Sequence, residues 1–453
     1  MIRSAAAMRI TNTVLQVRRP IAGTWLERVA SALSVELHAG RYPLRAAIAK
    51  VNDDAALIES TLVEFDSGDR IRQRFTGVEL IAPRRKHYQD AKFAVVQIVP
   101  TGVRCEIGGY AGDACPVTNL LAASADLVIT HPNAVNASEL NEMAGNVLYV
   151  EGRSLDDFLL GHLALVPTRS NRIGTFVDRT GVEYLDDVVS TLNAARAVGG
   201  IDCGIYTVSA EELGVRTLWS ETGCAVGTVR NPAAILEAVE HLLAQGVQAV
   251  GGVSVIHGVT ADEFARHLSG KIPNPSGSVE AIITHLISKA FRVPTAHAPL
   301  PYYQDVKARG THNPRASAEF ISTPHYLCVL KGLARAPRLE PIGRLDQVAG
   351  HLISLNNVGA IVVPASCLGG IPALVAEFSE IPLIAVEENH TLLDVTNDKM
   401  RMCNVIAVKS YLEAAGLILA LRNGISLESL RRPIVCASQT DAPMVTLGAA
   451  AGP

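Results

Sequence analysis

Polar side chains that could move protons or bind an anion follow several short apolar segments of this 453-residue sequence. The first group lies in residues 100–116 (PTGVRCEIGGYAGDACP), which follow the apolar segment 91–99 and contain four glycines. Glycine-rich backbone after a strand can approach an anion without interference from Cβ atoms. Asp113 could act as a base or a hydroxyl ligand, although tight turns alone could also explain the glycines. The candidate anion-binding residues of this segment are Thr101, Gly108 and Gly109.

The second group begins at the end of the apolar segment 125–130, in the sequence THPNAVNASELN. His131 is the best-placed general acid–base of the chain, because an imidazole titrates near neutral pH. Asn133 and Asn136 follow it and could orient a carbonyl or a carboxylate. The alternative is a helix N-terminus capped by Asn136 or Ser138, with His131 only hydrogen-bonded in a loop.

The third group lies near the C-terminus and combines a glycine turn with adjacent acidic residues. Residues 362–374 (VVPASCLGGIPAL) indicate a strand, a turn and a helix, a pattern typical of an anion-binding end or a nucleophile site. Cys367 would have a lowered thiol pKa if it lay at the N-terminus of that helix. Two acidic residues follow the next strand, within 381–396, and could transfer protons. The alternative interpretation is that they lie in a solvated loop. The remaining candidates of this group are Ser366, Gly369, Gly370, Glu387, Glu388 and Asn389.

A fourth segment, residues 296–320, contains Arg315 at the start of an expected helix. Its guanidinium could clamp a carboxylate or a phosphate, and the alternative is a surface arginine. No metal site is predicted, because the histidines lack a fixed metal-binding spacing and no cysteine pair is spaced C-x-x-C. The sequence has neither a P-loop nor a dinucleotide-binding fingerprint, so no cofactor is predicted. The histidines considered as metal ligands are His285, His297, His312 and His325.

An alternating β–α scaffold would bring these groups together. Short apolar runs alternate with helical segments from residue 91 onward, which predicts mostly parallel sheets with helices on both faces. Ligands of such sheets bind at the carboxyl ends of the strands, which is where the first three groups lie. The expected strands are 91–99, 125–130, 146–150, 173–177, 202–208, 249–256, 360–363, 382–386 and 404–408, and the expected helices are 236–245 and 411–422.

The first 85 residues have a different pattern, typical of a small α+β domain. They contain an alternating strand at 10–17, an amphipathic helix at 25–38, and a hairpin of residues 46–51 and 56–65. The predicted fold class is therefore α/β, with about two α/β domains and a small N-terminal α+β domain. The expected divisions are 1–85, 90–235 with the glycine-rich loop, 236–432, and a flexible tail at 433–453.

Composition excludes several classes of protein. Apolar residues make up 48% and charged residues 19% of the chain, which excludes a disordered protein. A net charge of −4 argues against a nucleic-acid partner. The apolar segments are broken by proline and glycine, so no membrane partner is expected and the cytoplasm is the expected location. Most of the eight cysteines are expected to be buried reduced thiols, and the composition is compatible with a homo-oligomer.

The order of these motifs along residues 91–432 resembles the family labelled domain of unknown function 3326. The resemblance rests on PTG, IGGYAGDA, ITHPN, LYVEG, HAP, PRASAE and V-x-EN-x-T, met in this order. It implies a shared pocket but no reaction, and the first 85 residues lie outside it. The blocks that the resemblance assigns to this pocket are Gly108-Gly109, His131-Pro132-Asn133, Pro314-Arg315-Ala316 and Glu388-Asn389.

The leading hypothesis is an enzyme acting on a small metabolite that bears a carboxylate or phosphate. Glycine-rich loops would hold the anion, and His131, Asp113 and the pair Glu387 and Glu388 would transfer protons, as in an isomerase, racemase or lyase. A weaker analogy joins Cys367 to the paired thiols of cofactor-independent racemases. The alternatives are a non-catalytic small-molecule binding protein and a nucleotide- or CoA-dependent transferase.

Overall fold

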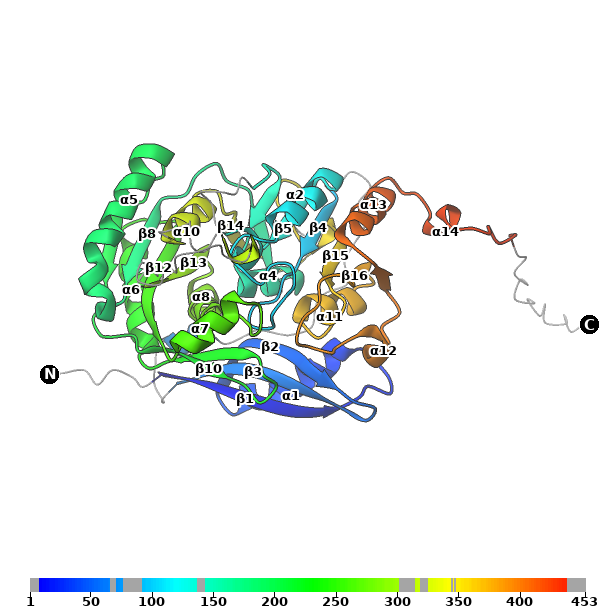
Figure 1. Ribbon diagram of the computed structural model, residues 1–453, viewed down its shortest axis with the longest axis horizontal. Coiled ribbons are helices and arrows are strands. Elements are labelled where there is room, and N and C mark those ends of the chain that lie inside the picture. Colours follow the sequence, from blue (N-terminus) through cyan, green and yellow to red (C-terminus); the bar gives the residue numbers. More distant parts are fainter. Residues whose placement is uncertain are drawn as a thin grey trace, which may run out of the picture.

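The computed structural model describes residues 8–65, 71–75, 92–136, 143–300, 314–317, 325–343, 345 and 348–437. These residues form three main sheets and a two-stranded ribbon, with helices around the two larger sheets (Figure 1). The predicted α/β class is confirmed. No helix of the described residues is long and apolar enough to cross a membrane.

The N-terminal unit is a three-stranded antiparallel sheet with one helix, in the order β1-β3-β2. Thr24 and Glu27 form a capping box that starts the helix at the predicted residue. The predicted hairpin is confirmed, and its turn is closed by Asn52, whose side chain accepts hydrogen bonds from two backbone N–H groups. The elements are β1 (Met8–Arg18), α1 (Trp25–His38), β2 (Arg41–Val51) and β3 (Ala55–Phe65), followed by the 3-10 turn Ile71–Arg74.

The second sheet has six parallel strands in the order β17-β16-β15-β4-β5-β6. Alternate residues of its strands pack against α4 and α11 on one face and against α2 and α13 on the other. The prediction of a parallel sheet covered on both faces is confirmed here. The strands are β4 (Ala94–Gln97), β5 (Leu127–Thr130), β6 (Val147–Tyr149), β15 (Val358–Pro364), β16 (Leu383–Val386) and β17 (Val405–Val408). The helices are α2 (Cys115–Ser124), α3 (Pro132–Val135), α4 (Gly152–Leu159), α11 (Ile371–Phe378), α12 (Asn397–Met400), α13 (Tyr411–Arg422) and α14 (Leu427–Leu430).

The third sheet is formed by the chain between β6 and β15, and its strands are parallel except for β11. The strands are β8 (Ile173–Val177), β9 (Ile205–Val208), β10 (Val215–Trp219), β11 (Ala225–Val229), β12 (Ala249–His257) and β13 (Thr295–Leu300). The helices are α5 (Leu185–Gly199), α6 (Pro232–Ala244), α7 (Ala261–Leu268), α8 (Gly277–Phe291) and α10 (His325–Ala334), and the ribbon is β7 (Leu163–Val166) with β14 (Arg338–Pro341). Short 3-10 turns are Arg179–Tyr184, Pro314–Ala316 and Leu355–Asn357.

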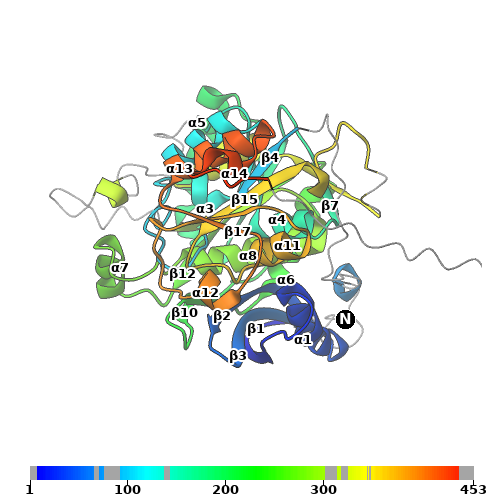
Figure 2. The same ribbon diagram turned by 90° about the vertical axis from the view of Figure 1, so that its right-hand side faces the viewer.

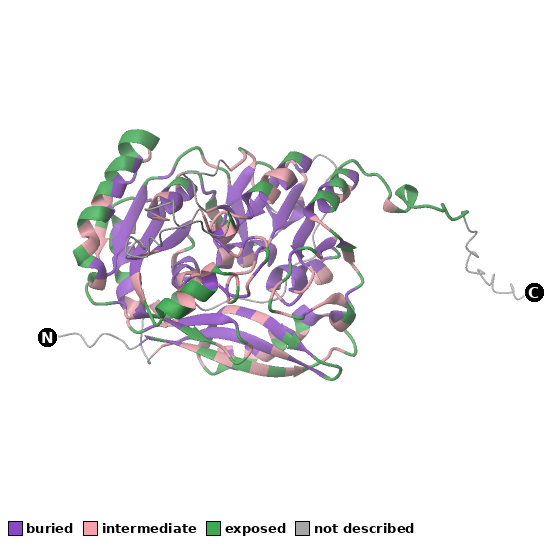
Figure 3. Ribbon diagram, in the orientation of Figure 1, coloured by how far each residue is buried: buried purple, intermediate pink, exposed green. Residues whose placement is uncertain are grey.

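The sheets divide the chain differently from the predicted domains. The expected division at 235/236 runs through the third sheet, because β8–β11 lie before it and β12 and β13 after it. The second sheet takes three strands from each predicted domain, so the segment that forms the third sheet is inserted into it. The boundary expected near residue 85 lies outside the described residues. Of the tail, residues 433–437 are exposed and the rest lies outside the described residues (Figure 3).

The N-terminal sheet lies beneath the two larger sheets and contacts both (Figure 1, Figure 2). Its edge strand β2 continues into backbone pairing with the turn before α11, where the Ile48 N–H donates to the Gly369 carbonyl at 2.9 Å. On the other side, the Asn12 side chain donates to the Gly227 carbonyl of β11 at 2.9 Å. An edge strand that is covered in this way cannot pair with another chain.

Gly369 is the residue that permits this docking, and its replacement by alanine should weaken it. A Cβ atom there would lie 2.1 Å from the Ile48 carbonyl oxygen, so the two backbones must separate. We expect Gly369→Ala to cost about 1–3 kcal/mol, a typical overpacking penalty. Calorimetry should therefore show a lower melting temperature.

Gly416→Ala is the matched control, because nothing lies within 4 Å of its added methyl group. Its position inside α13 favours alanine, so its melting temperature should stay unchanged or rise. Equal melting temperatures for the two variants would contradict the role given to Gly369.

Candidate functional site

A cavity of about 350 Å³ lies where the three sheets meet. It opens at the carboxyl ends of β4, β5, β6 and β15 and is closed by β2, α8 and β13. Its volume suits a small ligand. The polar and charged residues of its wall are Arg45, Glu59, Thr101, His131, Asn133, Asn136, Glu151, Asp156, Asn274, Ser276, Ser278, Glu280, Thr284, His285, His297 and His325.

The most deeply buried charge in this wall is the carboxylate of Glu151, directly after β6. One of its oxygens accepts hydrogen bonds from the Thr284 hydroxyl at 3.1 Å and from Nδ1 of His285, and the other accepts from the Ser154 N–H at 3.0 Å. Burial would raise the pKa of Glu151, but the charge of His285 and these hydrogen bonds hold it at about 2. Glu151 is therefore ionised, and its hydrogen bond to Nδ1 fixes the orientation of the His285 ring.

His131 faces the same cavity as a neutral imidazole. Its Nε2 atom accepts a hydrogen bond from the Val99 N–H at 3.0 Å, so the ring proton lies on Nδ1. Burial lowers the pKa of His131 to about 4, and the opposing charge of Glu151 offsets this only in part. The His285 charge acts on the pKa of His131 in the same direction as burial.

Asp156 and His297 complete the titratable groups near this pair. Burial raises the pKa of the Asp156 carboxyl to about 7, against the charges of Arg153 and His285. The His297 ring is bonded on both nitrogens, at 3.2 Å to Glu280 and at 2.9 Å to the Ser254 hydroxyl. His297 is thus held in place, whereas Asp156 titrates in the range where an acid or a base is useful.

The predicted residues Thr101, Asn133 and Asn136 do line the cavity. Asn133 donates to the Val99 and Gly108 carbonyls at 3.0 and 3.1 Å, and the Oδ1 atom of Asn136 accepts from the Tyr149 hydroxyl at 3.2 Å. Asn133 therefore holds the loops after β4 and β5 against each other, and Asn136 joins the end of α3 to β6. The structure brings His131 and its two asparagines together as the sequence predicted.

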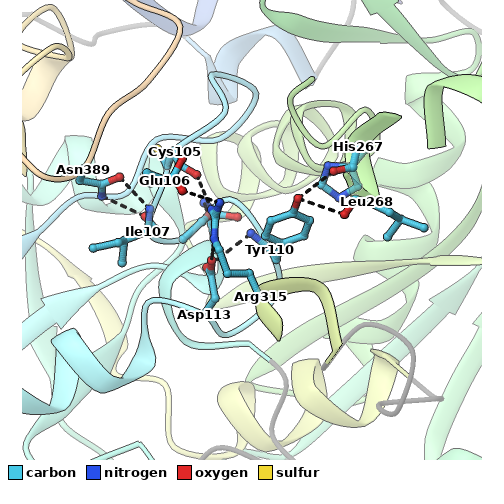
Figure 4. Close-up of polar contacts among 11 residues, drawn as sticks. Cys105, Glu106, Ile107, Tyr110, Asp113, His267, Leu268, Arg315 and Asn389 are labelled. Carbon is cyan, nitrogen blue, oxygen red and sulfur yellow. Dashed lines mark hydrogen bonds and ion pairs between the residues drawn. The ribbon is translucent and has the colours of Figure 1, made fainter. Parts of the chain in front are cut away.

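The glycine-rich loop after β4 packs closely against its own backbone and against Arg315, as Figure 4 shows for the Arg315 contacts. Arg315 donates to Glu106 at 2.9 Å, to the Cys105 carbonyl at 3.0 Å and to Asp113 at 3.3 Å, and it lies over the Tyr110 ring. A Cβ atom at Gly109 would lie 2.3 Å from the Cys105 carbonyl, and at Gly108 2.1 Å from the Val99 side chain. The glycines serve close packing.

Asp113 and Arg315 are consequently partners of each other and lie outside the cavity wall. Burial raises the pKa of Asp113 to about 6 although Arg315 opposes the shift. Their predicted roles as a base and an anion clamp require a substrate that reaches this loop. The geometry instead gives them a structural role in holding the loop.

Asn389 fastens the same loop to the end of β16. Its amide accepts from the Ile107 N–H and donates to the Ile107 carbonyl, both at 2.9 Å, and it also donates to the Tyr411 hydroxyl at 2.9 Å (Figure 4). Backbone bonds from Glu106 to His390 and from Leu392 to Val103 continue this pairing. Asn389 is thus a positioning residue for the loop that carries part of the cavity wall.

The acids predicted to transfer protons after β16 lie outside the cavity wall. Glu387 forms an ion pair with the exposed Lys409 at 2.5 Å. Glu388 accepts a hydrogen bond from the Tyr411 N–H at 2.8 Å at the start of α13. Glu387 therefore forms a surface ion pair, and Glu388 accepts a hydrogen bond at the N-terminus of α13.

Cys367 lines the cavity, but the prediction of a lowered thiol pKa is wrong. Burial raises its pKa to about 11, against hydrogen bonds from Thr391 and Ser366, so the thiol stays protonated at neutral pH. Ser366 is bonded to the Thr391 hydroxyl at 2.8 Å. Gly369 and Gly370, which also line the cavity, are occupied by the pairing with β2.

Several residues of the cavity were missed by the sequence reasoning. Glu151 directly follows a predicted strand and belongs to the LYVEG block, so the carboxyl-end rule could have found it. His285 lies inside a helix and Arg45 inside a strand, and neither position carries a local signal. Within the described residues, no group of three or more His, Cys, Asp or Glu side chains could hold a metal ion. His312 lies outside the described residues.

The fold and the cavity define an α/β protein with a cavity between three sheets that is lined by buried titratable side chains. The family model described as protein of unknown function (DUF3326) matches residues 94–431, and the chain belongs to this family. An uncharacterized lipoprotein of Synechococcus sp. is 34% identical over 340 residues, which are 74% of this chain and 92% of that protein. No solved structure matches the chain. The expected cytoplasmic location stays a prediction.

The tautomer and pKa of His131 can be measured directly by nitrogen-detected NMR of histidine-labelled protein. We expect the neutral Nδ1–H form at pH 6 and titration near pH 4, because burial disfavours the imidazolium. The spectrum of His131→Gln assigns the signal by its loss. Titration of this ring near 6.5, the value of an exposed imidazole, would contradict the geometry.

Loss of the Asn389 side chain should destabilise the fold. Asn389→Ala leaves the Ile107 N–H and carbonyl and the Tyr411 hydroxyl without their partner, at about 1–3 kcal/mol for each group that stays unsatisfied. Chemical denaturation should show a lower midpoint. Asn423→Ala, at an exposed amide at the end of α13, is the control and should leave the midpoint unchanged. Equal midpoints would show that Asn389 does not fasten the loop.

Proposed function

We propose that the protein is an enzyme that transfers protons on a small metabolite bearing a carboxylate or phosphate, in the manner of an isomerase, racemase or lyase. One observation carries this proposal. Two different acid–base systems, neutral His131 and the Glu151–His285 pair, face one cavity of about 350 Å³, with Asp156 beside them.

The Glu151–His285 pair is suited to accept a proton from a carbon or oxygen atom of the substrate. Glu151 holds Nδ1 of His285, and Nε2 of that ring forms no hydrogen bond with the described residues, so the neutral form of the ring can take a proton there and its charged form can return one. The adjacent carboxylate stabilises the imidazolium that results. Because its pKa is about 2, the Glu151 carboxylate stays ionised and can stabilise the imidazolium over the whole physiological pH range.

His131 is suited to the complementary step. Its Nδ1–H can donate a hydrogen bond to a substrate carbonyl whose oxygen gains negative charge when the neighbouring carbon loses its proton. Because its pKa is about 4, it acts as a neutral donor and does not compete for a proton at neutral pH. Asp156, with a pKa of about 7, can return a proton to the other carbon or to a leaving hydroxyl group.

The test has two stages, of which the first finds a ligand. Purified protein is heated with small carboxylates, amino acids, sugar phosphates, nucleotides and acyl-CoAs, and a ligand at 100 times its Kd should add about 2.7 kcal/mol of stability. The ligand that raises the melting temperature most is then incubated in deuterated water. Incorporation of deuterium at carbon, measured by mass spectrometry, is the expected result.

Variants identify the groups that transfer the proton. We expect His285→Gln to slow deuterium incorporation by about 10²–10⁴-fold, the usual contribution of a positioned acid or base. His131→Ala should slow it by about 10²–10³-fold, the usual contribution of a hydrogen-bond donor to a developing oxyanion. Glu387→Gln is the control, because this carboxylate lies outside the cavity, and its rate should equal that of the wild type.

A ligand that binds without any exchange or turnover would favour a non-catalytic binding protein instead. Stabilisation by nucleotides or acyl-CoA alone would favour a transferase. Exchange that survives in both histidine variants would place the chemistry elsewhere.

A further inference from the structure

Resting on the proposed function, we propose that Arg45 of the N-terminal sheet binds a carboxylate group of the substrate. The region that the family model matches, which begins at residue 94, contributes no arginine or lysine to the described cavity wall. Arg315 of that region is bonded to the glycine-rich loop instead. Arg45 is the only arginine or lysine among the described residues of the cavity wall. This inference narrows the proposed class of substrates from carboxylates and phosphates to small carboxylic acids.

The strand β2 is irregular on both sides of the segment that begins at Arg45. Its pairing with β3 is interrupted by register shifts between Pro43 and Arg45 and between Ile48 and Lys50. Residues 45–49, which run from the first shift into the second, all line the cavity. Such irregularities bend a strand and redirect its side chains. The Ser60 hydroxyl donates to the Arg45 carbonyl at 2.9 Å and fixes the backbone at this point.

The guanidinium of Arg45 has donors that the described residues do not use. Its neighbour is Glu59, but Nη2 and Oε2 of the two side chains are 3.8 Å apart, which is too long for a hydrogen bond. The other oxygen of Glu59 accepts the Thr222 hydroxyl at 2.5 Å, which holds the carboxylate in place. The Arg45 side chain is only 22% exposed, so water does not fully surround these donors.

Arg315 shows what a guanidinium occupied by the protein looks like in this structure. It bonds to three groups of the glycine-rich loop and supports the fold. Arg45 differs, because it lines the cavity and the described residues form no hydrogen bond with its guanidinium, whose planar fork of donors matches a carboxylate.

The charge of the wall favours a carboxylate over a phosphate. Glu59, Glu151 and Glu280 also line the cavity, and a single guanidinium faces them. Arg45 is already paired with Glu59 at 3.8 Å, so a carboxylate with one negative charge meets less repulsion from these glutamates than a phosphate dianion does. A carboxylate held at Arg45 also leaves the rest of a small molecule to face His131 and His285.

The test is isothermal titration of the complete protein with acetate, pyruvate, succinate and inorganic phosphate at constant ionic strength. We expect at least one carboxylate to bind more tightly than phosphate. Arg45→Met should weaken that binding at least 30-fold, and Arg45→Lys should weaken it less, because lysine keeps the charge but loses the planar fork. Arg18→Met, on the exposed face of β1, is the matched control and should bind as the wild type does.

The proposal is overturned if no carboxylate binds, if phosphate binds more tightly than every carboxylate, or if both Arg45 variants bind as the wild type does. Melting curves test whether each variant is folded. If Arg45→Met does not fold, the comparison is made with Arg45→Lys alone. Carboxylate binding that depends on Arg45 but is followed by no deuterium exchange would support this inference and refute the proposed proton transfer. The two proposals therefore fail separately.

Discussion

The buried carboxylate of Glu151 is the interaction on which the architecture of the cavity depends. It stands at the end of β6, caps α4 through Ser154, and holds Thr284 and His285 of α8. Because α8 packs against β11 and β13, this one group joins the second sheet to the third. A carboxylate that is only 3% exposed must be fully hydrogen-bonded to remain charged, so the position of each partner is constrained. The orientation of the His285 ring follows from that constraint.

The walls of the cavity come from three parts of the chain with different tasks. The second sheet supplies His131 and Glu151, α8 supplies His285, and the N-terminal sheet closes the cavity and supplies Arg45. The family match covers His131, Glu151 and His285 and begins after Arg45, so the proposed acid–base groups and the proposed carboxylate site come from different parts of the chain. The backbone pairing of Ile48 with Gly369 fixes the distance between the two parts.

Much of the fold could be predicted because its signals are local. The helices at 25–38 and 411–422 begin and end at the predicted residues, and the apolar strands alternate with helices as expected. His131 could be found because it follows a buried strand, and the cavity lies at that strand end. The arrangement of the sheets could not be predicted in this way, because β4 and β15 pair across an insertion of more than 200 residues that carries no marker in the sequence.

The partners of long polar side chains were equally hidden. Glu151 and His285 are 134 residues apart, and Arg315 and Glu106 are 209 residues apart. Local sequence shows that such charged groups exist but not which opposite charge each one contacts. Arg315 was therefore predicted to bind an anion and Glu387 to transfer a proton, although each forms an ion pair within the protein. The thiol of Cys367 was misjudged for a related reason. Its pKa depends on how deeply the fold buries it, and burial raises that pKa to about 11.

The most direct test of the account is a crystal structure of the complete chain with the carboxylate that raises its melting temperature most. The account predicts electron density for this ligand in the cavity, with its carboxylate against Arg45 and the rest of the molecule between His131 and His285. Density at the glycine-rich loop beside Asp113 and Arg315, with the cavity empty, would contradict it.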